Sequence, residues 1–167
     1  MPYTGKHGIK MLAGILPLLF FTFMGVGLVL AGEQKDMGGW ELNSPYNKLY
    51  NASEMDRIKG RVKKVTTVVP MKGMAPGVAL VFEESKEDVS WVHICPEWYL
   101  GRKDIGIKKG DKLKIRGAWA EIDGEFIFMA SKIKKGDYFE LKVRLTKNGK
   151  PFWTMGPEEL AQETKQQ

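Results

Sequence analysis

A histidine and a cysteine stand two residues apart, at His93 and Cys95, and both residue types bind transition metals. If this segment is a strand, both side chains point to the same face. Two ligands at that spacing would begin a zinc or copper site, which carboxylates or methionines would have to complete. The other histidine, His7, precedes a hydrophobic segment, so a histidine cluster is not predicted. A buried thiol beside a hydrogen-bonded histidine is the competing interpretation.

Two methionines and four acids offer further metal ligands. Met71 and Met74 lie in a turn bounded by prolines, and thioethers suit copper(I) or haem iron; packing at the end of a barrel is the alternative. Four acidic residues gather at one turn: Glu83, Glu84, Glu87 and Asp88. Their carboxylate oxygens would bind iron or calcium ions weakly, and a solvated hairpin loop is the alternative. There is no Cys-x-x-Cys-His motif, so covalent c-type haem is not predicted.

Basic residues alternate along three segments with the spacing of a strand's outer face. They are Arg57, Lys59, Arg61 and Lys63; Lys112, Lys114 and Arg116; and Lys142 and Arg144. On a small barrel they would form one basic face that suits an acidic protein partner or an anionic lipid, although a solubilising surface is the simplest explanation. Nucleic acid is the less favoured ligand. Single-strand binders stack bases on aromatic residues between the charges, whereas Trp119 follows the apolar phase.

The residue types do not combine into a recognisable catalytic motif. The sequence has no nucleophile paired with a base, no glycine-rich phosphate loop and no metalloprotease helix. We therefore expect a non-catalytic binding or accessory module without a resident cofactor. If the domain contacts iron at all, the acidic turn is where we expect that contact. A metal- or redox-linked periplasmic binding protein is the first alternative, and a nucleic-acid binder of the OB-fold type is the second.

A hydrophobic stretch near the N-terminus decides which compartment these residues occupy. Residues 11–31 carry no charged side chain, and a helix of that length spans a hydrocarbon core roughly 30 Å thick. Lys6 and Lys10 precede the stretch, which predicts that residues 1–10 stay in the cytoplasm and that the rest of the chain lies outside it. We expect an uncleaved transmembrane anchor. A signal peptide cleaved after Ala31 is the alternative.

Length, charge and cysteine content narrow the class of protein. A chain of 167 residues allows one ordinary domain with appendages. Its net charge of +6 is mildly basic and falls short of what a dedicated nucleic-acid binder usually carries. The single cysteine excludes an intramolecular disulfide bond and is more typical of bacterial envelope proteins than of secreted eukaryotic domains.

The elements that must position these side chains follow from a period of two. Alternation predicts strands over 57–69, 78–83, 89–94, 110–117, 126–133 and 138–145, with a helical turn at 96–100 and a hairpin turn at Asp123-Gly124. This order predicts an all-β domain at 56–156: a five- to six-stranded OB-fold-like Greek-key barrel, with an SH3-like barrel as the alternative. The aromatic residues of 32–55 predict a linker partly packed on that domain. Residues 157–167 form a polar tail, helical or frayed.

Turn glycines and packing aromatics carry a resemblance to known proteins. They are Gly60-Arg61-Val62, residues 74–78, residues 96–100, Lys109-Gly110-Asp111, Gly117 and residues 149–153. In this order they resemble small membrane-anchored bacterial envelope proteins with an OB-like domain. Trp40 and Ser44-Pro45-Tyr46-Asn47, after a single anchor, are similar to the corresponding segment of MamS-type magnetosome proteins, accessories of magnetite crystal formation. The resemblance implies a domain in the periplasm or the magnetosome lumen and a partner among envelope or magnetosome proteins, and it supplies no catalytic residues.

Overall fold

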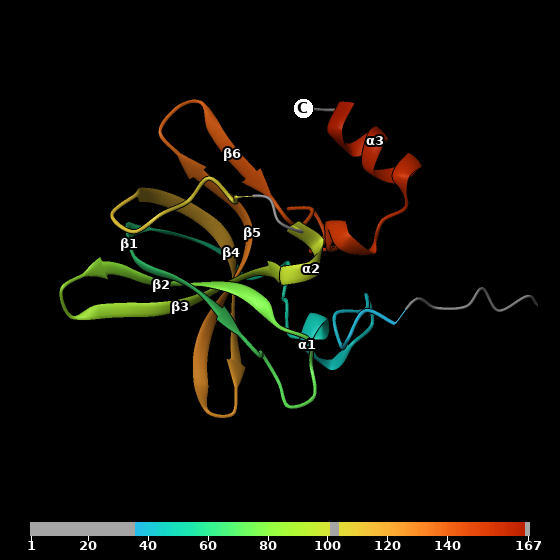
Figure 1. Ribbon diagram of the computed structural model, residues 1–167, viewed down its shortest axis with the longest axis horizontal. Coiled ribbons are helices and arrows are strands. Elements are labelled where there is room, and N and C mark those ends of the chain that lie inside the picture. Colours follow the sequence, from blue (N-terminus) through green and yellow to red (C-terminus); the bar gives the residue numbers. More distant parts are fainter. Residues whose placement is uncertain (1–35, 101–103, 166–167) are drawn as a thin grey trace, which may run out of the picture. The chain divides into compact units, whose positions relative to one another are not determined.

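The structure is a computed structural model that describes residues 36–100 and 104–165 (Figure 1). Its strands are β1 (Met55–Val68), β2 (Gly77–Ser85), β3 (Asp88–Pro96), β4 (Lys112–Ile122), β5 (Glu125–Lys135) and β6 (Phe139–Lys142). Its helices are α1 (Pro45–Lys48), α2 (Glu97–Leu100), α3 (Pro157–Lys165) and a 3-10 helix, η1 (Phe152–Thr154). The described part of the chain is therefore mostly β, as the alternation predicts.

The predicted N-terminal segments, residues 1–10 and the anchor at 11–31, lie outside the described residues. Between residues 36 and 165, leaving aside the gap at 101–103, no helix is both long enough and apolar enough to cross a membrane.

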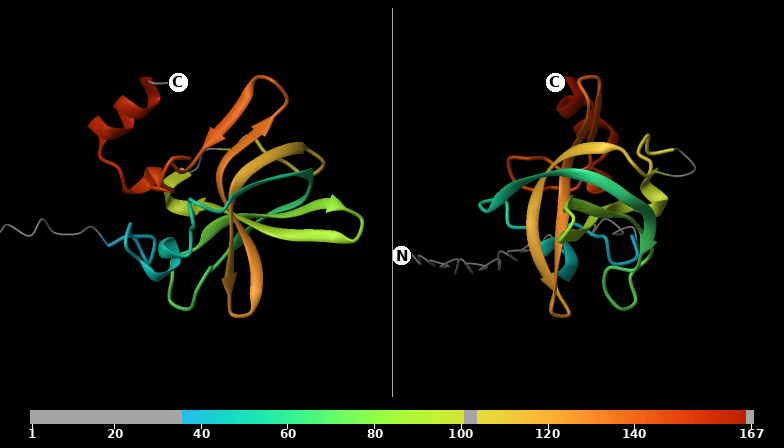
Figure 2. Two further views of the ribbon diagram at one scale, coloured as in Figure 1. Left: turned by 180° about the vertical axis from the view of Figure 1, so that it is seen from behind. Right: turned by 90° about the vertical axis from the view of Figure 1, so that its left-hand side faces the viewer.

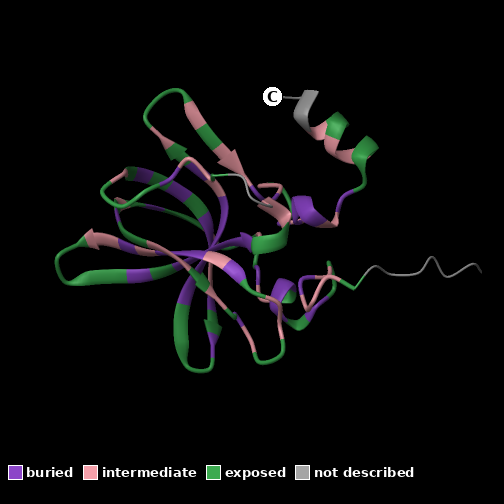
Figure 3. Ribbon diagram, in the orientation of Figure 1, coloured by how far each residue is buried: buried purple, intermediate pink, exposed green. Residues whose placement is uncertain are grey.

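The strands are hydrogen-bonded in the order β3-β2-β1-β4-β5-β6, and neighbours in this order are antiparallel. One further, parallel pairing joins residues 91–93 of β3 to residues 127–129 of β5. Followed from neighbour to neighbour, the hydrogen-bonded strands run β1, β2, β3, β5, β4 and back to β1. Strand β6 pairs with β5 and is not part of this closed series. Two further views show strongly curved strands that cross over a common centre (Figure 2). Buried residues gather there, while the hairpin tips are exposed (Figure 3).

Two glycines allow the curved strands to approach one another closely. A β-carbon on Gly117 would lie 2.1 Å from the carbonyl oxygen of Met129, and one on Gly60 would lie 2.2 Å from that of Glu83. Any larger residue would push the strands apart at these two positions. The register of β4 on β5 also shifts between Arg116 and Gly117, and such a bulge bends the strand that carries it.

Three local predictions agree with the structure. Asp123 and Gly124 form the turn between β4 and β5, with φ angles of 52° and 83°, the positive values that a two-residue hairpin prefers. The helical turn expected at 96–100 is helix α2. The tail at 157–167 was expected to be either helical or frayed, and it begins with helix α3.

Strand β6 is shorter than the strand predicted over 138–145, because the alternation breaks at its end. The backbone N–H groups of Val143 and Arg144 both donate to the carbonyl of Ser131, with N···O distances of 2.9 and 3.2 Å. Two donors on one carbonyl shift the in-and-out alternation by one residue, as in a β-bulge. Arg144 therefore turns inward, where it is only 1% exposed.

Residues 36–50, here called the lead-in, pack on the sheet. Trp40 is fully buried and Tyr46 is 1% exposed. The Trp40 indole N–H donates to the carbonyl of Ala75, and the Trp40 carbonyl accepts from the indole N–H of Trp153, both at 2.9 Å. The side chain of Ser44 caps helix α1. The lead-in is therefore part of the folded domain rather than a flexible tether.

Candidate functional site

The register of four strands places basic side chains directly beside one another. Across β1 and β4, Arg57 is opposite Arg116, Lys59 is opposite Lys114, and Arg61 is opposite Lys112. Strands β5 and β6 extend these rows with Lys132, Lys134 and Lys142. We call the following set the cationic face: Arg57, Lys59, Arg61, Lys112, Lys114, Arg116, Lys132, Lys134 and Lys142. Sequence reasoning missed Lys132 and Lys134, although their alternation with the apolar Ile133 is the signal that identified the other rows.

Most of this charge is not neutralised within the described part of the chain. Like charges that lie opposite each other on neighbouring strands destabilise a sheet. Glu140 is the one described carboxylate that pairs with the face, at 3.0 Å from Lys134, 3.2 Å from Lys142 and 3.9 Å from Lys132. Although partial burial alone would raise it, hydrogen bonds from Lys134 and Lys142 hold the pKa of Glu140 below its ordinary value. The basic residues of β1 and β4 on the face form no ion pair with another described residue.

The cationic face is grooved rather than flat. One surface hollow of about 500 Å³ has Lys59, Arg61, Lys112, Lys114 and Lys134 on its lining, together with residues 83–86 of the β2–β3 hairpin. A second hollow of about 270 Å³ is lined by Arg57, Lys114, Arg116, Lys132 and Lys134, together with Ile115. Lys114 and Lys134 line both hollows. Such a surface suits anionic groups that project from a partner.

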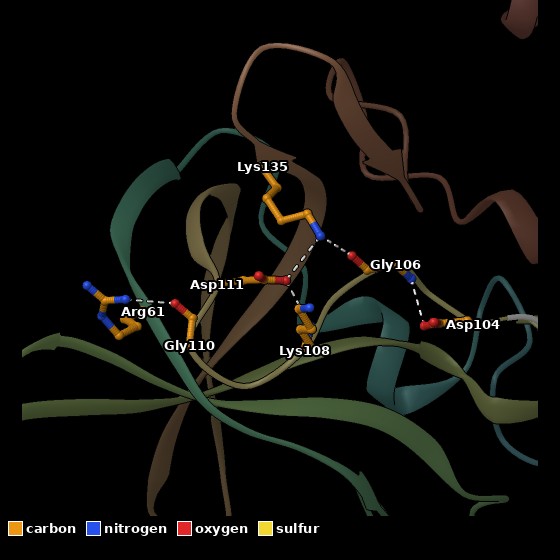
Figure 4. Close-up of polar contacts among 7 residues, drawn as sticks. All are labelled: Arg61, Asp104, Gly106, Lys108, Gly110, Asp111 and Lys135. Atoms are coloured by element: carbon orange, nitrogen blue, oxygen red, sulfur yellow. Dashed lines mark hydrogen bonds and ion pairs between the residues drawn. The ribbon is translucent and has the colours of Figure 1, made fainter.

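The loop before β4 holds one edge of the larger hollow in place (Figure 4). The guanidinium of Arg61 donates to the carbonyl of Gly110 at 2.8 Å. The carboxylate of Asp111 pairs with Lys135 at 3.1 Å and accepts the backbone N–H of Lys108 at 2.9 Å. That backbone hydrogen bond is the main reason why the pKa of Asp111 lies below its ordinary value. Lys135 also donates to the carbonyl of Gly106. This network orients Arg61 and the first residues of β4.

The predicted acidic turn lies at the tip of the β2–β3 hairpin, beside the cationic face. The carboxylate of Glu83 forms an ion pair with Lys63 at 2.9 Å. Lys63, which the sequence assigned to the basic face, is therefore neutralised and is not counted in the cationic face. Burial and the nearby Asp88 raise the pKa of Glu84, while Glu87 and Asp88 are exposed. Among the residues that the structure describes, no group of three or more histidine, cysteine or acidic side chains is assembled to hold a metal ion.

His93 and Cys95 lie beneath the lead-in rather than at the surface. His93 is 5% exposed, and its Nδ1 lies 3.2 Å from the hydroxyl of Tyr46. Cys95 is fully buried, and burial raises the pKa of its thiol to about 12. The predicted ligands Met71 and Met74 are half-buried, and Met74 packs beneath Gly39 of the lead-in. This arrangement matches a buried thiol beside a hydrogen-bonded histidine, with methionines as packing residues.

Arg144 does not belong to the basic face, and its predicted outward position is wrong. Its guanidinium donates to the side-chain oxygen of Asn47 at 2.8 Å and to the carbonyl of Gly149 at 3.3 Å. The same group lies 5.1 Å from the ring centroid of Tyr50 and 4.8 Å from that of Trp153. It forms no ion pair with a described carboxylate, so hydrogen bonds and aromatic faces alone stabilise this buried charge.

Acid should destabilise the fold through His93. Burial lowers the pKa of His93 to about 4 from the ordinary 6.5. As the pH falls, the imidazole of His93 is protonated in the unfolded chain before it is protonated in the folded one. The contribution of neutral His93 to the free energy of unfolding is therefore fully present above pH 6.5 and is lost as the pH falls towards 4. The loss should approach about 3 kcal/mol. Urea unfolding at about pH 7 and about pH 5 should therefore show a larger drop for the wild type than for His93→Gln; equal drops would contradict this assignment.

The fold and the site together define a class: a small all-β domain organised around a grooved cationic face. A model of the MamS/MamX magnetosome protein family matches residues 54–140, and the chain belongs to this family. The predicted resemblance to MamS is thereby confirmed, and family membership associates the chain with magnetosomes. The matched segment begins just before β1 and includes every residue of the cationic face except Lys142. No curated protein matches the chain.

Proposed function

We propose that this chain is a non-catalytic accessory module of the magnetosome, which binds an acidic partner protein through its cationic face and so supports magnetite crystal formation. In this proposal residues 11–31 anchor the chain in a membrane, with residues 1–10 in the cytoplasm. The domain at 56–156, with its packed lead-in and its C-terminal tail, then lies in the magnetosome lumen or the periplasm. Family membership and the charge pattern of the N-terminal segment support this setting.

The observation that carries the proposal is the side-by-side register of unpaired cations on β1 and β4. Three cross-strand pairs of these strands, at every second position and therefore on one face, are basic on both sides. Each such pair weakens the isolated domain, so the arrangement has a cost that an anionic partner would remove. The loop network around Asp111 orients Arg61 within this array. A surface needed only for solubility would not require cations to face one another across strands.

A protein partner fits this face better than nucleic acid or a membrane surface. No aromatic side chain of the described residues lines either hollow of the cationic face, whereas binding of single-stranded nucleic acid relies on stacking bases on aromatic rings. Glu83 and Glu84 lie on the wall of the larger hollow, where an anionic bilayer would meet like charge. A folded partner can instead place its acids on the cations and its basic groups on these two carboxylates.

We also propose that the domain is an OB-type barrel. The pairings run from β1 through β2, β3, β5 and β4 and back to β1, which is the strand order of a closed five-stranded Greek-key barrel. Helix α2 lies between β3 and β4 in the chain, where that fold carries its helix. Strand β6 extends the sheet beyond the five strands.

Reversing charge on the face should weaken binding of acidic partners. In the double variant Lys59→Glu/Lys114→Glu, two directly opposed cations become acids. We expect the dissociation constant of a poly-glutamate peptide to rise about tenfold, which is about 1.4 kcal/mol, and the difference to shrink at high salt. Isothermal titration with the full chain measures the constant. The same variant should also retain less acidic protein from solubilised magnetosome membranes.

The matched control is Lys48→Glu/Lys72→Glu. These two lysines are exposed but lie outside the cationic face, and their reversal changes the net charge by the same amount. If the control weakens binding as much as the face variant does, net charge rather than the arranged face explains the attraction, and the proposal fails.

A further inference from the structure

Five aromatic side chains form an unbroken series of ring contacts through the buried side of the lead-in. From the outside inward, the ring centroids are 6.4 Å apart for Trp98 and Tyr99, 6.0 Å for Tyr99 and Trp153, 5.6 Å for Trp153 and Trp40, and 4.9 Å for Trp40 and Tyr46. All four contacts are edge-to-face. The residues come from the lead-in, helix α2 and the 3-10 helix η1, so only the tertiary fold brings them together.

The inner end of the series is a phenol that is hydrogen-bonded to an imidazole. The hydroxyl of Tyr46 lies 3.2 Å from Nδ1 of His93, and the two rings are stacked at 29°. In the tautomer that carries its proton on Nε2, the imidazole of His93 accepts the phenolic proton of Tyr46 at Nδ1. Burial lowers the pKa of His93, so its imidazole is neutral near neutral pH and can accept that proton.

The outer end of the series reaches the surface at Trp98. This indole is 41% exposed, while Trp153 is 5% exposed and Trp40 and Tyr46 are more deeply buried. Trp98 lines a surface hollow of about 510 Å³ together with residues 36–38 and Ala75. A small redox-active molecule in this hollow would therefore contact the outermost ring of the series and none of the inner ones.

We infer that these five residues form a path that carries single oxidising equivalents between a one-electron oxidant at Trp98 and the Tyr46–His93 pair. The oxidant at the surface gains one electron, which Trp98 supplies. Tyr99, Trp153 and Trp40 pass the electron outward in turn, and Tyr46 is its final source. As Tyr46 loses the electron, its phenolic proton moves to Nδ1 of His93. The products are a neutral tyrosyl radical, an imidazolium and the reduced oxidant, so charge and atoms balance.

The direction of transfer follows from the proton acceptor. An oxidised phenol is far more acidic than an imidazolium, so proton transfer to His93 stabilises the oxidised state at Tyr46. Trp40 and Trp153 have no comparable base, because their indole N–H groups donate to backbone carbonyls. The path thus gives the domain a place to hold one oxidising equivalent away from solvent and to return it. This inference uses other residues than the cationic face and does not depend on partner binding.

Flash–quench oxidation of the full chain tests the path. Photogenerated tris(bipyridine)ruthenium(III) serves as the oxidant, and transient absorption and EPR spectra distinguish tyrosyl from tryptophan radicals. The background is Tyr3→Phe/Tyr138→Phe, which removes two tyrosines outside the path, one of them fully exposed. In this background we expect a tyrosyl radical that is lost in Tyr46→Phe, and a slower formation rate in heavy water because a proton moves with the electron.

Trp98→Phe and Trp91→Phe form the decisive pair of variants. The two indoles are almost equally exposed, at 41% and 40%, but among the described aromatic side chains Trp91 contacts no ring. Trp98→Phe should lose most of the tyrosyl signal, and Trp91→Phe should keep it. The inference is overturned if no tyrosyl radical forms, if the radical survives in Tyr46→Phe, or if the two tryptophan variants behave alike. Both substitutions are at the surface, so loss of folding does not confuse the comparison.

Discussion

Replacing Arg144 with glutamate should lower the free energy of unfolding by about 4 kcal/mol, a large part of the stability of an ordinary domain. The new carboxylate would be buried against the side-chain oxygen of Asn47 and the carbonyl of Gly149, both of which now accept hydrogen bonds from Arg144. Two acceptors would face an acid that offers no proton, and the cation would be lost from the faces of Tyr50 and Trp153. Urea unfolding of the full chain measures the change.

Arg116→Glu is the control for this prediction, because sequence alone assigns both arginines to the same basic face. Arg116 is exposed, with Arg57 and Lys132 opposite it on the neighbouring strands. Its reversal should change stability by no more than about 0.5 kcal/mol, or even increase it by relieving repulsion. Similar costs for the two variants would mean that Arg144 is not buried as the structure has it.

Trp40→Ala should cost about 3–5 kcal/mol, because it removes the centre of the packing between the lead-in and the sheet. The indole is fully buried and lies edge-to-face with both Tyr46 and Trp153. Its N–H donates to the carbonyl of Ala75, which would be left without that donor. Thermal unfolding reports the loss, and limited proteolysis should show new cleavage within residues 36–50 as the lead-in detaches.

Leu42→Ala provides the matched comparison for Trp40→Ala. Leu42 lies in the same lead-in but is 41% exposed, so its truncation should change stability by about 0.5 kcal/mol or less. If the two variants unfold at the same temperature and are cleaved equally, the lead-in does not depend on Trp40. The proposed electron path, which passes through this indole, would then lose its structural basis as well.

Local patterns predicted most of the β-structure because each depends on near neighbours in the chain. In a strand with one buried face, apolar and polar residues must alternate. The apolar residues Ile58 and Val62, which lie between basic residues, therefore identified β1. Asp123-Gly124 identified the β4–β5 turn because few residue pairs adopt positive φ at low cost. The aromatic residues of the lead-in indicated packing because large apolar side chains are rarely left in a solvated tether.

The candidate site was predictable in its residue types and only partly in its membership. Alternation assigned the cations of β1 and β4 to an outer face, and the structure places them there, in register with one another. It could not show that Glu140 would pair with three lysines, nor that the acidic turn would form the wall of a hollow over the same face. Both facts depend on strand order, and a period of two does not encode strand order.

The sequence by itself determined the alternation, the hairpin turn and the chemical types of the side chains, because these depend on residue identity and on spacing along the chain. Only the tertiary structure decided that β3 pairs with β5, since those strands lie more than thirty residues apart at their paired positions. It alone turned Arg144 inward, because the Ser131 carbonyl that receives two donors comes from another strand. It also joined Tyr46 to His93, a contact between residues 47 positions apart. Long-range packing sets such contacts, and no local pattern records it.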